Sequence, residues 1–408
     1  MTANAASLSE SEGRAIPSAT RGRRWLRRLG LAAIVLGVPL GGLLADAWSA
    51  MGARPSGARL ARMKASPEYA DGHFVNALPV VNADFWSMMQ RWVKGAEGSA
   101  PATPPPIVKR GAADFATPPS SGLRITWFGH SSMLVEIDGH RVLTDPVWSE
   151  RCSPSRFIGP KRFFAPPMPI EALPALDVVV LSHDHYDHLD RSTILALEAR
   201  APRYAVPLGV GAHLEHWGVP AARIAELDWW EETTVGGVRL VATPARHFSG
   251  RGLADAEATL WAGWAMIGAA HRVFFSGDTG MFPGFIEIGA RLGPFDATMI
   301  EVGAYDAMWA DVHLGPEQAV QAHQDVRGRF MVPVHWGTFD LALHPWTEPV
   351  ERLMVAAERA KVPIAVPKPG ESIEPASSPE VTRWWPQIRW RTADEAPVTS
   401  SGLAPPAG

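Results

Sequence analysis

The ten-residue stretch LSHDHYDHLD contains three histidines and three aspartates, all side chains that can bind metal ions. It follows the apolar run LDVVV, so the cluster is predicted to begin where a buried strand ends. In an extended segment alternate side chains point the same way, so His183 and His185 can share one metal while Asp187 and His188 face a second. Placing several such polar and charged side chains in one small volume costs free energy unless a cation neutralises them. The spacing therefore predicts a metal site.

Three other predicted strands each end near one more candidate ligand. His247 follows VRLVATPAR, Asp278 follows RVFFSG, and His335 follows RFMVPV. Open α/β sheets build their sites from side chains at the carboxyl ends of successive strands. Each of these residues alone is typical of a turn or a cap, but the set predicts two metal ions held by nitrogen and oxygen. The carboxylate of Asp278 can bridge the two ions, with a shared position left for water.

Two further side chains are candidates for supporting roles. Asp145 ends the predicted strand RVLTD, where its carboxylate would orient a ligand imidazole by accepting the ring's other N–H. An ordinary turn residue at a strand end is the alternative. His130, in FGHSS, is the second candidate, and a turn or core role is its alternative.

The elements that must position these residues are those of an α/β chain. Of the 408 residues 46% are hydrophobic, enough for a large buried core, and a single cysteine excludes a disulfide framework and a thiolate-only metal cage. Between residues 123 and 375 short apolar runs alternate with helical patterns. The first three runs are closely spaced, which favours an opening hairpin, and the later ones predict mixed sheets with outer helices.

The N-terminal region predicts contact with a membrane. Residues 1–28 form a basic tail with six arginines, and residues 29–45 are almost entirely apolar. The apolar segment is shorter than the roughly 20 residues of a comfortable span, and 45–47 offers a small-x-small cleavage site, so a transmembrane anchor and a cleaved signal both stay open. A buried core helix is a third alternative. We expect a membrane-associated protein with its main domain exported to the periplasmic side, with a cytoplasmic location as the alternative.

The flanks of the main domain have a different composition. Residues 46–122 are predicted to be an N-terminal extension and linker, whose Pro-rich part 95–122 is either a linker or an arm lying on the surface. Residues 376–408 are predicted to be a C-terminal extension that is partly disordered. The formal charge is −4, and no Lys/Arg run in the body of the chain forms a stripe for phosphates. Nucleic acid is therefore not an expected partner.

Ordered motifs across residues 120–370 resemble a known family. The metal motif, its downstream histidine, GDTG and VPVHWGTF are similar to the metallo-β-lactamase superfamily. The stretches FGHSSMLVEIDG, ELDWWEE, TPARHFSGR, VGAYDAMW and VHLGPEQAVQAH resemble, in order, the N-acylphosphatidylethanolamine-hydrolysing phospholipase D family. The resemblance implies an αββα sandwich of two mixed sheets flanked by helices. The segment SPEYADGHFVN at 66–76 also resembles one that bacterial relatives carry ahead of the catalytic domain.

The resemblance also implies roles for the site residues and a cofactor of two zinc ions. His313 matches the family's extra histidine near the substrate phosphate, and with Asp187 it is the predicted catalytic residue. The implied ligands of one zinc are His183, His185 and His247, those of the other are Asp187, His188 and His335, and Asp278 bridges them.

The expected activity is hydrolysis of N-acylphosphatidylethanolamine to phosphatidic acid and N-acylethanolamine. Two cations suit a phosphodiester because they neutralise its charge and lower the pKa of water to about 7. A lactonase or other hydrolase of the superfamily is the first alternative. A membrane-anchored lipid-binding protein with a structural metal is the second, although structural zinc sites are usually closed by four protein ligands. Phospholipid and membrane are the expected partners, and a homodimer is left open. Some tryptophans are candidates to line an acyl-binding groove or touch the bilayer, with a core position as the alternative for each: Trp148, Trp229, Trp230, Trp261, Trp264 and Trp309.

Overall fold

The computed structural model divides the chain into two compact units, Met1–Asp46 and Ala47–Gly408. The predicted anchor or signal segment at 29–45 lies almost entirely outside the described residues. No helix among the residues that are described is long and apolar enough to cross a membrane. The described residues are 45–81, 83, 85–200, 202–252, 254–377 and 381–403, with Trp25, Arg28, Gly41 and Gly42.

The first sheet of the second unit has seven strands in the order β15-β3-β4-β5-β6-β7-β8. It opens with the expected hairpin, in which Asp138 and Gly139 both have positive φ in the turn between β4 and β5. Neighbouring strands are antiparallel from β15 through β3 and β4 to β5, and parallel from β5 through β6 and β7 to β8. The strands are β3 (Leu123–Gly129), β4 (Ser132–Ile137), β5 (His140–Thr144), β6 (Val178–Val180), β7 (Arg203–Pro207), β8 (Ile224–Leu227) and β15 (Ser372–Ile373).

The second sheet has six strands in the order β14-β13-β12-β11-β10-β9. β9 to β12 form an antiparallel meander, and β12, β13 and β14 are parallel, so the sheet is mixed as predicted. The strands are β9 (Glu232–Val235), β10 (Val238–Thr243), β11 (Gly263–Ile267), β12 (Arg272–Phe275), β13 (Ala297–Glu301) and β14 (Met331–Val334).

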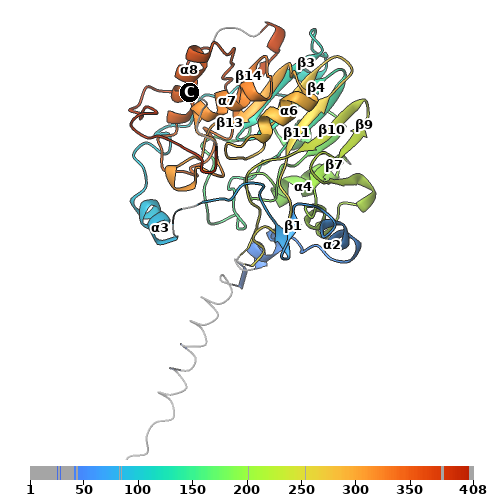
Figure 1. The fold of residues 1–408 in the computed structure, drawn as a ribbon. Coiled ribbons are helices and arrows are strands. Elements are labelled where there is room, and N and C mark those ends of the chain that lie inside the picture. The colour runs from blue at the N-terminus through green and yellow to red at the C-terminus, as the bar shows by residue number, and fades with distance from the viewer. Residues whose placement is uncertain are drawn as a thin grey trace, which may run out of the picture. The chain divides into compact units, whose positions relative to one another are not determined.

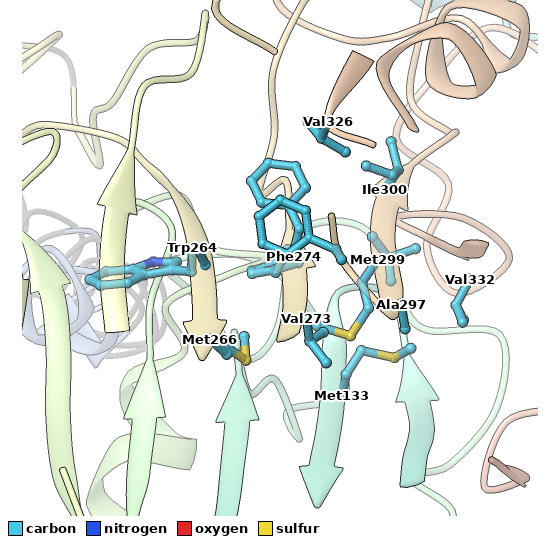
Figure 2. Close-up of a cluster of buried hydrophobic side chains, with 14 of the residues drawn as sticks. Met133, Trp264, Met266, Val273, Phe274, Ala297, Met299, Ile300, Val326 and Val332 are labelled. Carbon is cyan, nitrogen blue, oxygen red and sulfur yellow. The ribbon is translucent and has the colours of Figure 1, made fainter. Parts of the chain in front are cut away.

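Side chains that alternate along each strand place the core between the two sheets. In β4, Met133 and Val135 belong to the large apolar cluster shared by both sheets, whereas Leu134 belongs to the cluster under α4 and α5. Figure 2 shows Met133 in the shared cluster with Met266 and Met299 of the second sheet. Both faces of β4 are thus covered, which explains why all its residues are buried.

Helices cover the outer faces, so the architecture is the αββα sandwich that the resemblance implies. Figure 1 shows α4 beside β7 and α7 beside β13 and β14, and α6 packs against α7. α4 begins after Asp190, whose carboxylate caps it by accepting from the Ser192 amide. The helices of the sandwich are α4 (Arg191–Glu198), α5 (Gly211–His216), α6 (Gly284–Leu292), α7 (Pro316–Asp325) and α8 (Glu348–Ala360).

Three of the six tryptophans that are candidates to line an acyl-binding groove are core residues, the alternative for each. Trp229, Trp261 and Trp264 are buried, and their indole N–H groups donate to the carbonyls of Trp261, Ala245 and Leu181. A buried indole needs such a partner, and here the loops that end strands supply it. The other three, Trp148, Trp230 and Trp309, are half-buried.

The flanking segments are packed against the sandwich. The Pro-rich stretch at 95–122 lies on the surface as an arm, where the Val108 amide donates to Pro369 O at 2.8 Å. The C-terminal extension, predicted to be partly disordered, is packed over its described part: Trp385 is buried, and the Ser400 hydroxyl donates to Ala310 O at 2.7 Å. Residues 404–408 lie outside the described part of the chain. The extension ahead of the arm contains α2 (Gly57–Met63), the hairpin β1 (Tyr69–Ala70) and β2 (His73–Phe74), and α3 (Phe85–Lys94).

Candidate metal centre

All seven predicted ligands lie together between the carboxyl ends of strands from the two sheets. The first sheet contributes the loop after β6, which folds back on itself because the amides of His188 and Leu189 both donate to His185 O. The second sheet contributes one residue after each of β10, β12 and β14. The parallel strands β12 and β14 end at the same edge, which is why residues distant in sequence meet there.

The first group consists of His183, His185 and His247. His183 Nε2 lies 2.8 Å from His185 Nδ1, and His247 Nε2 lies 3.3 Å from the same nitrogen. His183 and His247 are buried, and His185 is half-buried. One nitrogen from each ring is thus within reach of a single ion.

The second group consists of Asp187, His188 and His335, joined by His130. Asp187 Oδ2 lies 3.4 Å from His188 Nε2, 3.3 Å from His335 Nε2 and 2.9 Å from His130 Nε2. His130, predicted as a supporting residue, is therefore in direct contact with a ligand carboxylate. Its ring also packs on that of His335, with the centroids 4.1 Å apart.

Asp278 lies between the two groups. Its Oδ2 is 3.1 Å from His188 Nε2 and 3.0 Å from His335 Nε2 on one side. On the other side it is 4.0 Å from His183 Nε2 and 3.9 Å from His247 Nε2. This single oxygen faces imidazoles of both groups, which is the position expected of a bridging carboxylate.

The donor atoms of the site fit metal ions. His188 Nε2 and Asp278 Oδ1 are buried and make no hydrogen bond among the described residues. Buried polar atoms without partners are rare because each costs free energy. A cation between these nitrogens and oxygens would satisfy them, and imidazole with carboxylate is a donor set that suits transition metals such as zinc and iron. That each of the seven residues binds a metal stays a prediction.

Electrostatics favours the metal-binding form of some of the predicted ligands but not of all. Burial alone would lower the pKa of His188 and of His335, but the carboxylate of Asp278 raises both above the usual value, so a metal must displace their protons. Burial lowers the pKa of His183 and of His247 well below the usual value, so both rings are neutral. Burial alone would raise the pKa of Asp278, but the neighbouring His188 and His335 hold it well below the usual range. Neutral imidazoles and an ionised carboxylate are the ligand forms that metal binding requires.

Hydrogen bonds to the outer ring nitrogens orient three of the imidazoles. Asp145 takes the predicted supporting position: its buried Oδ2 accepts from His188 Nδ1 at 2.7 Å, and its Oδ1 accepts from the Ser182 amide at 2.7 Å. His247 Nδ1 donates to Val312 O at 2.9 Å, and His183 Nδ1 lies 2.9 Å from Ser182 Oγ. In each ring Nε2 is therefore the nitrogen directed at the site.

His313 joins the site through a residue that the sequence analysis missed. Its Nδ1 lies 2.8 Å from Oε2 of Glu301 and 3.9 Å from Asp278 Oδ2, and its ring stacks on that of His335. Glu301 ends β13 and is completely buried, and its Oε1 accepts from the Thr279 amide at 2.6 Å. The only signal in the sequence was a carboxylate at the end of the apolar run ATMIEV.

Comparisons with known proteins agree with this geometry. The Beta-lactamase superfamily domain model matches residues 140–336, which include all seven predicted ligands. An uncharacterized Mycobacterium tuberculosis protein is 48% identical over 378 residues, 89% of this chain and 99% of that protein. "N-acyl-phosphatidylethanolamine-hydrolyzing phospholipase D 1" of Caenorhabditis elegans is 40% identical over 261 residues, 61% of this chain and 73% of that protein. A "metal-dependent hydrolase" of Pyrobaculum neutrophilum is 30% identical over 256 residues, 62% of this chain and all of that protein.

A solved structure shows the same fold. The isothiocyanate hydrolase from Delia radicum gut bacteria matches with a TM-score of 0.50 and 20% identity, over 62% of this chain and 98% of that one. At this level of identity the likeness concerns the fold and carries no information on the substrate.

Proposed function

We propose that this chain, which belongs to the metallo-β-lactamase superfamily and is a metal-dependent hydrolase, hydrolyses N-acylphosphatidylethanolamine-type phospholipids with two zinc ions. The products would be phosphatidic acid and an N-acylethanolamine. The observation that carries the proposal is the similarity to the Caenorhabditis elegans phospholipase D.

The ligand arrangement supports a centre of two ions. His183, His185 and His247 would hold one ion, and Asp187, His188 and His335 the other, with Asp278 between them. Two zinc ions bound there would neutralise the charge of a phosphodiester and lower the pKa of a bound water to about 7. The orphaned atoms His188 Nε2 and Asp278 Oδ1 lie where the two groups meet.

His313 is suited to move a proton at the reacting phosphate. Glu301 engages its Nδ1, so Nε2 is the nitrogen left to contact the substrate. From there it can donate a hydrogen bond to a phosphoryl oxygen or a proton to the leaving alkoxide. His313 is partly exposed at the site, whereas Glu301 is shielded from water behind it.

Exposed apolar residues support a lipid substrate and an association with a membrane surface. Phe248 is partly exposed and packs on the rings of His185 and His247, with centroids 4.6 and 4.7 Å away. On α3, Trp86 and Val93 are 71% and 81% exposed. α3 lies near the site, because the backbone just before it contacts the loop before His313: the Ala83 amide donates to Met308 O at 2.8 Å. Amphipathic helices can lie at membrane interfaces, and this exposed apolar surface supports the proposed association with a membrane.

A panel of substrates offered to the zinc-loaded full-length protein tests the proposal. N-Acylphosphatidylethanolamine, phosphatidylcholine and a simple lactone would be supplied separately, and the products identified by mass spectrometry. We expect phosphatidic acid and N-acylethanolamine from the first lipid, with loss of turnover after chelation. Rapid opening of the lactone without lipid turnover would contradict the substrate while leaving the metal centre in place.

A further inference from the structure

We infer that Asn76, in the extension ahead of the family domain, is a positioning residue for His247. The inference rests on the proposed metal centre and does not depend on the lipid substrate. Asn76 lies outside residues 140–336, the part that matches the family model. The metal centre of this chain would then be completed by a segment that is not part of that domain.

The side chain of Asn76 binds both backbone groups of His247. Its Nδ2 donates to His247 O at 2.7 Å, and its Oδ1 accepts from the His247 amide at 3.1 Å. A carboxamide can do this because it has a donor and an acceptor in one plane, whereas a carboxylate has acceptors only. The contact replaces the pairing that a neighbouring strand would give.

His247 needs such support because it lies beyond the end of its strand. β10 ends at Thr243, and the described residues between it and Gly263 contain no helix or strand. The ring of His247 is oriented by Val312 O, to which Nδ1 donates. With the backbone held by Asn76 and the ring by Val312, its Nε2 is fixed toward His185 at 3.3 Å.

Asn76 is itself held by a buried anchor. It follows β2, whose Phe74 is completely buried in the large apolar cluster. The Phe74 amide donates to Glu257 O at 2.9 Å, and the Val75 amide donates to Glu68 O at 2.8 Å. The position of the carboxamide is therefore determined by the core.

A second set of contacts joins the same extension to the loop that carries His183 and His185. The Ala53 amide donates to His213 Nδ1 at 3.1 Å, and His213 Nε2 lies 3.3 Å from Oδ2 of the intervening residue, Asp184. Arg251 donates through Nε to Ala50 O at 3.0 Å and through an amino group to Leu189 O at 2.9 Å. The extension thus supports both sequence segments that supply the first ligand group.

Metal binding by variants of the full-length protein tests the inference. We would measure zinc stoichiometry and affinity by competition with a chelator, and the visible spectrum of the cobalt-substituted protein. Asn76→Ala should weaken one of the two metal sites by about 10- to 100-fold, the range found when a residue that orients a metal ligand is removed. Asn76→Asp, nearly the same size, keeps the acceptor for the His247 amide but loses the donor, and should also weaken that site.

Arg59→Gln is the matched control. Arg59 fixes the same extension through Glu226 at 2.6 Å and Glu215 at 2.8 Å, and neither partner is a predicted ligand. We expect this variant to keep the affinity of both metal sites and the cobalt spectrum even if its melting temperature falls. Unchanged affinity and spectrum in both Asn76 variants would overturn the inference. A wild-type protein that binds no metal would instead refute the proposed centre.

Discussion

Oε2 of Glu301 lies 2.8 Å from Nδ1 of His313, and the carboxyl group is fully shielded from solvent. Burial raises the pKa of Glu301 above its usual value. The pairing fixes the orientation of the His313 ring and leaves Nε2 available for substrate. Two residues from different elements therefore form one hydrogen-bonded pair at the site.

Replacing either member of this pair should separate chemistry from metal binding. His313→Gln should keep both metals and lose turnover by about 100-fold or more, since it removes the proton-transferring ring. Glu301→Gln keeps the shape but removes the charge, so we expect a smaller loss of kcat. Metal content and kcat of each variant would be measured together. If His313→Gln loses metal, then His313 is a ligand; if turnover is unchanged, it has no role in the reaction.

His185→Ala should lower metal content and activity together. Its Nδ1 lies within 3.3 Å of the Nε2 atoms of both His183 and His247, so its removal leaves the first group with two imidazoles. His216→Ala is the matched control, since this histidine on α5 is exposed and belongs to neither ligand group. Elemental analysis and turnover of both variants would be compared. Full metal content with full activity in His185→Ala would show that the assignment of this ligand is wrong.

The position of solvent oxygen in the products should identify the bond that breaks. Attack of water on phosphorus, with the N-acylethanolamine oxygen leaving, puts ¹⁸O from enriched water into phosphatidic acid. Hydrolysis of an acyl ester would instead put it into a released fatty acid. The full-length protein would be given N-acylphosphatidylethanolamine in detergent micelles, and its products weighed by mass spectrometry. We expect label in phosphatidic acid and none in N-acylethanolamine.

His323 should make stability depend on pH through a group far from the reaction. It is buried in α7 with Nδ1 2.8 Å from Thr298 Oγ1, and burial lowers its pKa to about 4. In the unfolded chain the ring takes up a proton near pH 6.5, so the unfolded state binds more protons below that value. Its contribution is present above pH 6.5 and is lost as the pH falls towards 4. Denaturant unfolding at several pH values should show a shallower pH dependence in His323→Asn than in the wild type.

The clustering of the seven predicted ligands could be predicted from sequence because each follows a strand that is recognisable on its own. The spacing within LSHDHYDHLD and the apolar runs before His247, Asp278 and His335 are local signals. Glu301 gives no comparable signal, because its proposed role depends on its contact with His313. That contact forms only when the loop between them folds back and returns His313 to the end of β13. Asn76 acts on a residue 171 positions away, a distance over which a single sequence carries no spacing rule.

Local sequence patterns also do not predict the order of the strands or the packing of the flanking segments, because both depend on contacts between residues far apart in the sequence. β15 pairs with β3 and forms one edge of the first sheet, so residues from the two ends of the domain lie side by side. Trp229, Trp261 and Trp264, candidates to line an acyl-binding groove, are core residues whose indole groups donate to loop carbonyls. The C-terminal extension looked disordered from its composition, yet Ser401 Oγ donates to Asp311, a contact that composition does not encode.

The division of the ligands between two sheets sets the order in which the centre is built during translation. A chain emerging from the ribosome presents the loop after β6 first, then His247, then Asp278, and His335 only after β14. Ligands in an unfolded segment do not form a ready site, so an ion is retained only once its group is complete. The first group has all three histidines once His247 has left the tunnel, and Val312 O, which orients the His247 ring, follows 65 residues after it. The second group must wait for His335, almost ninety residues after His247, when the last strand of the second sheet can pair.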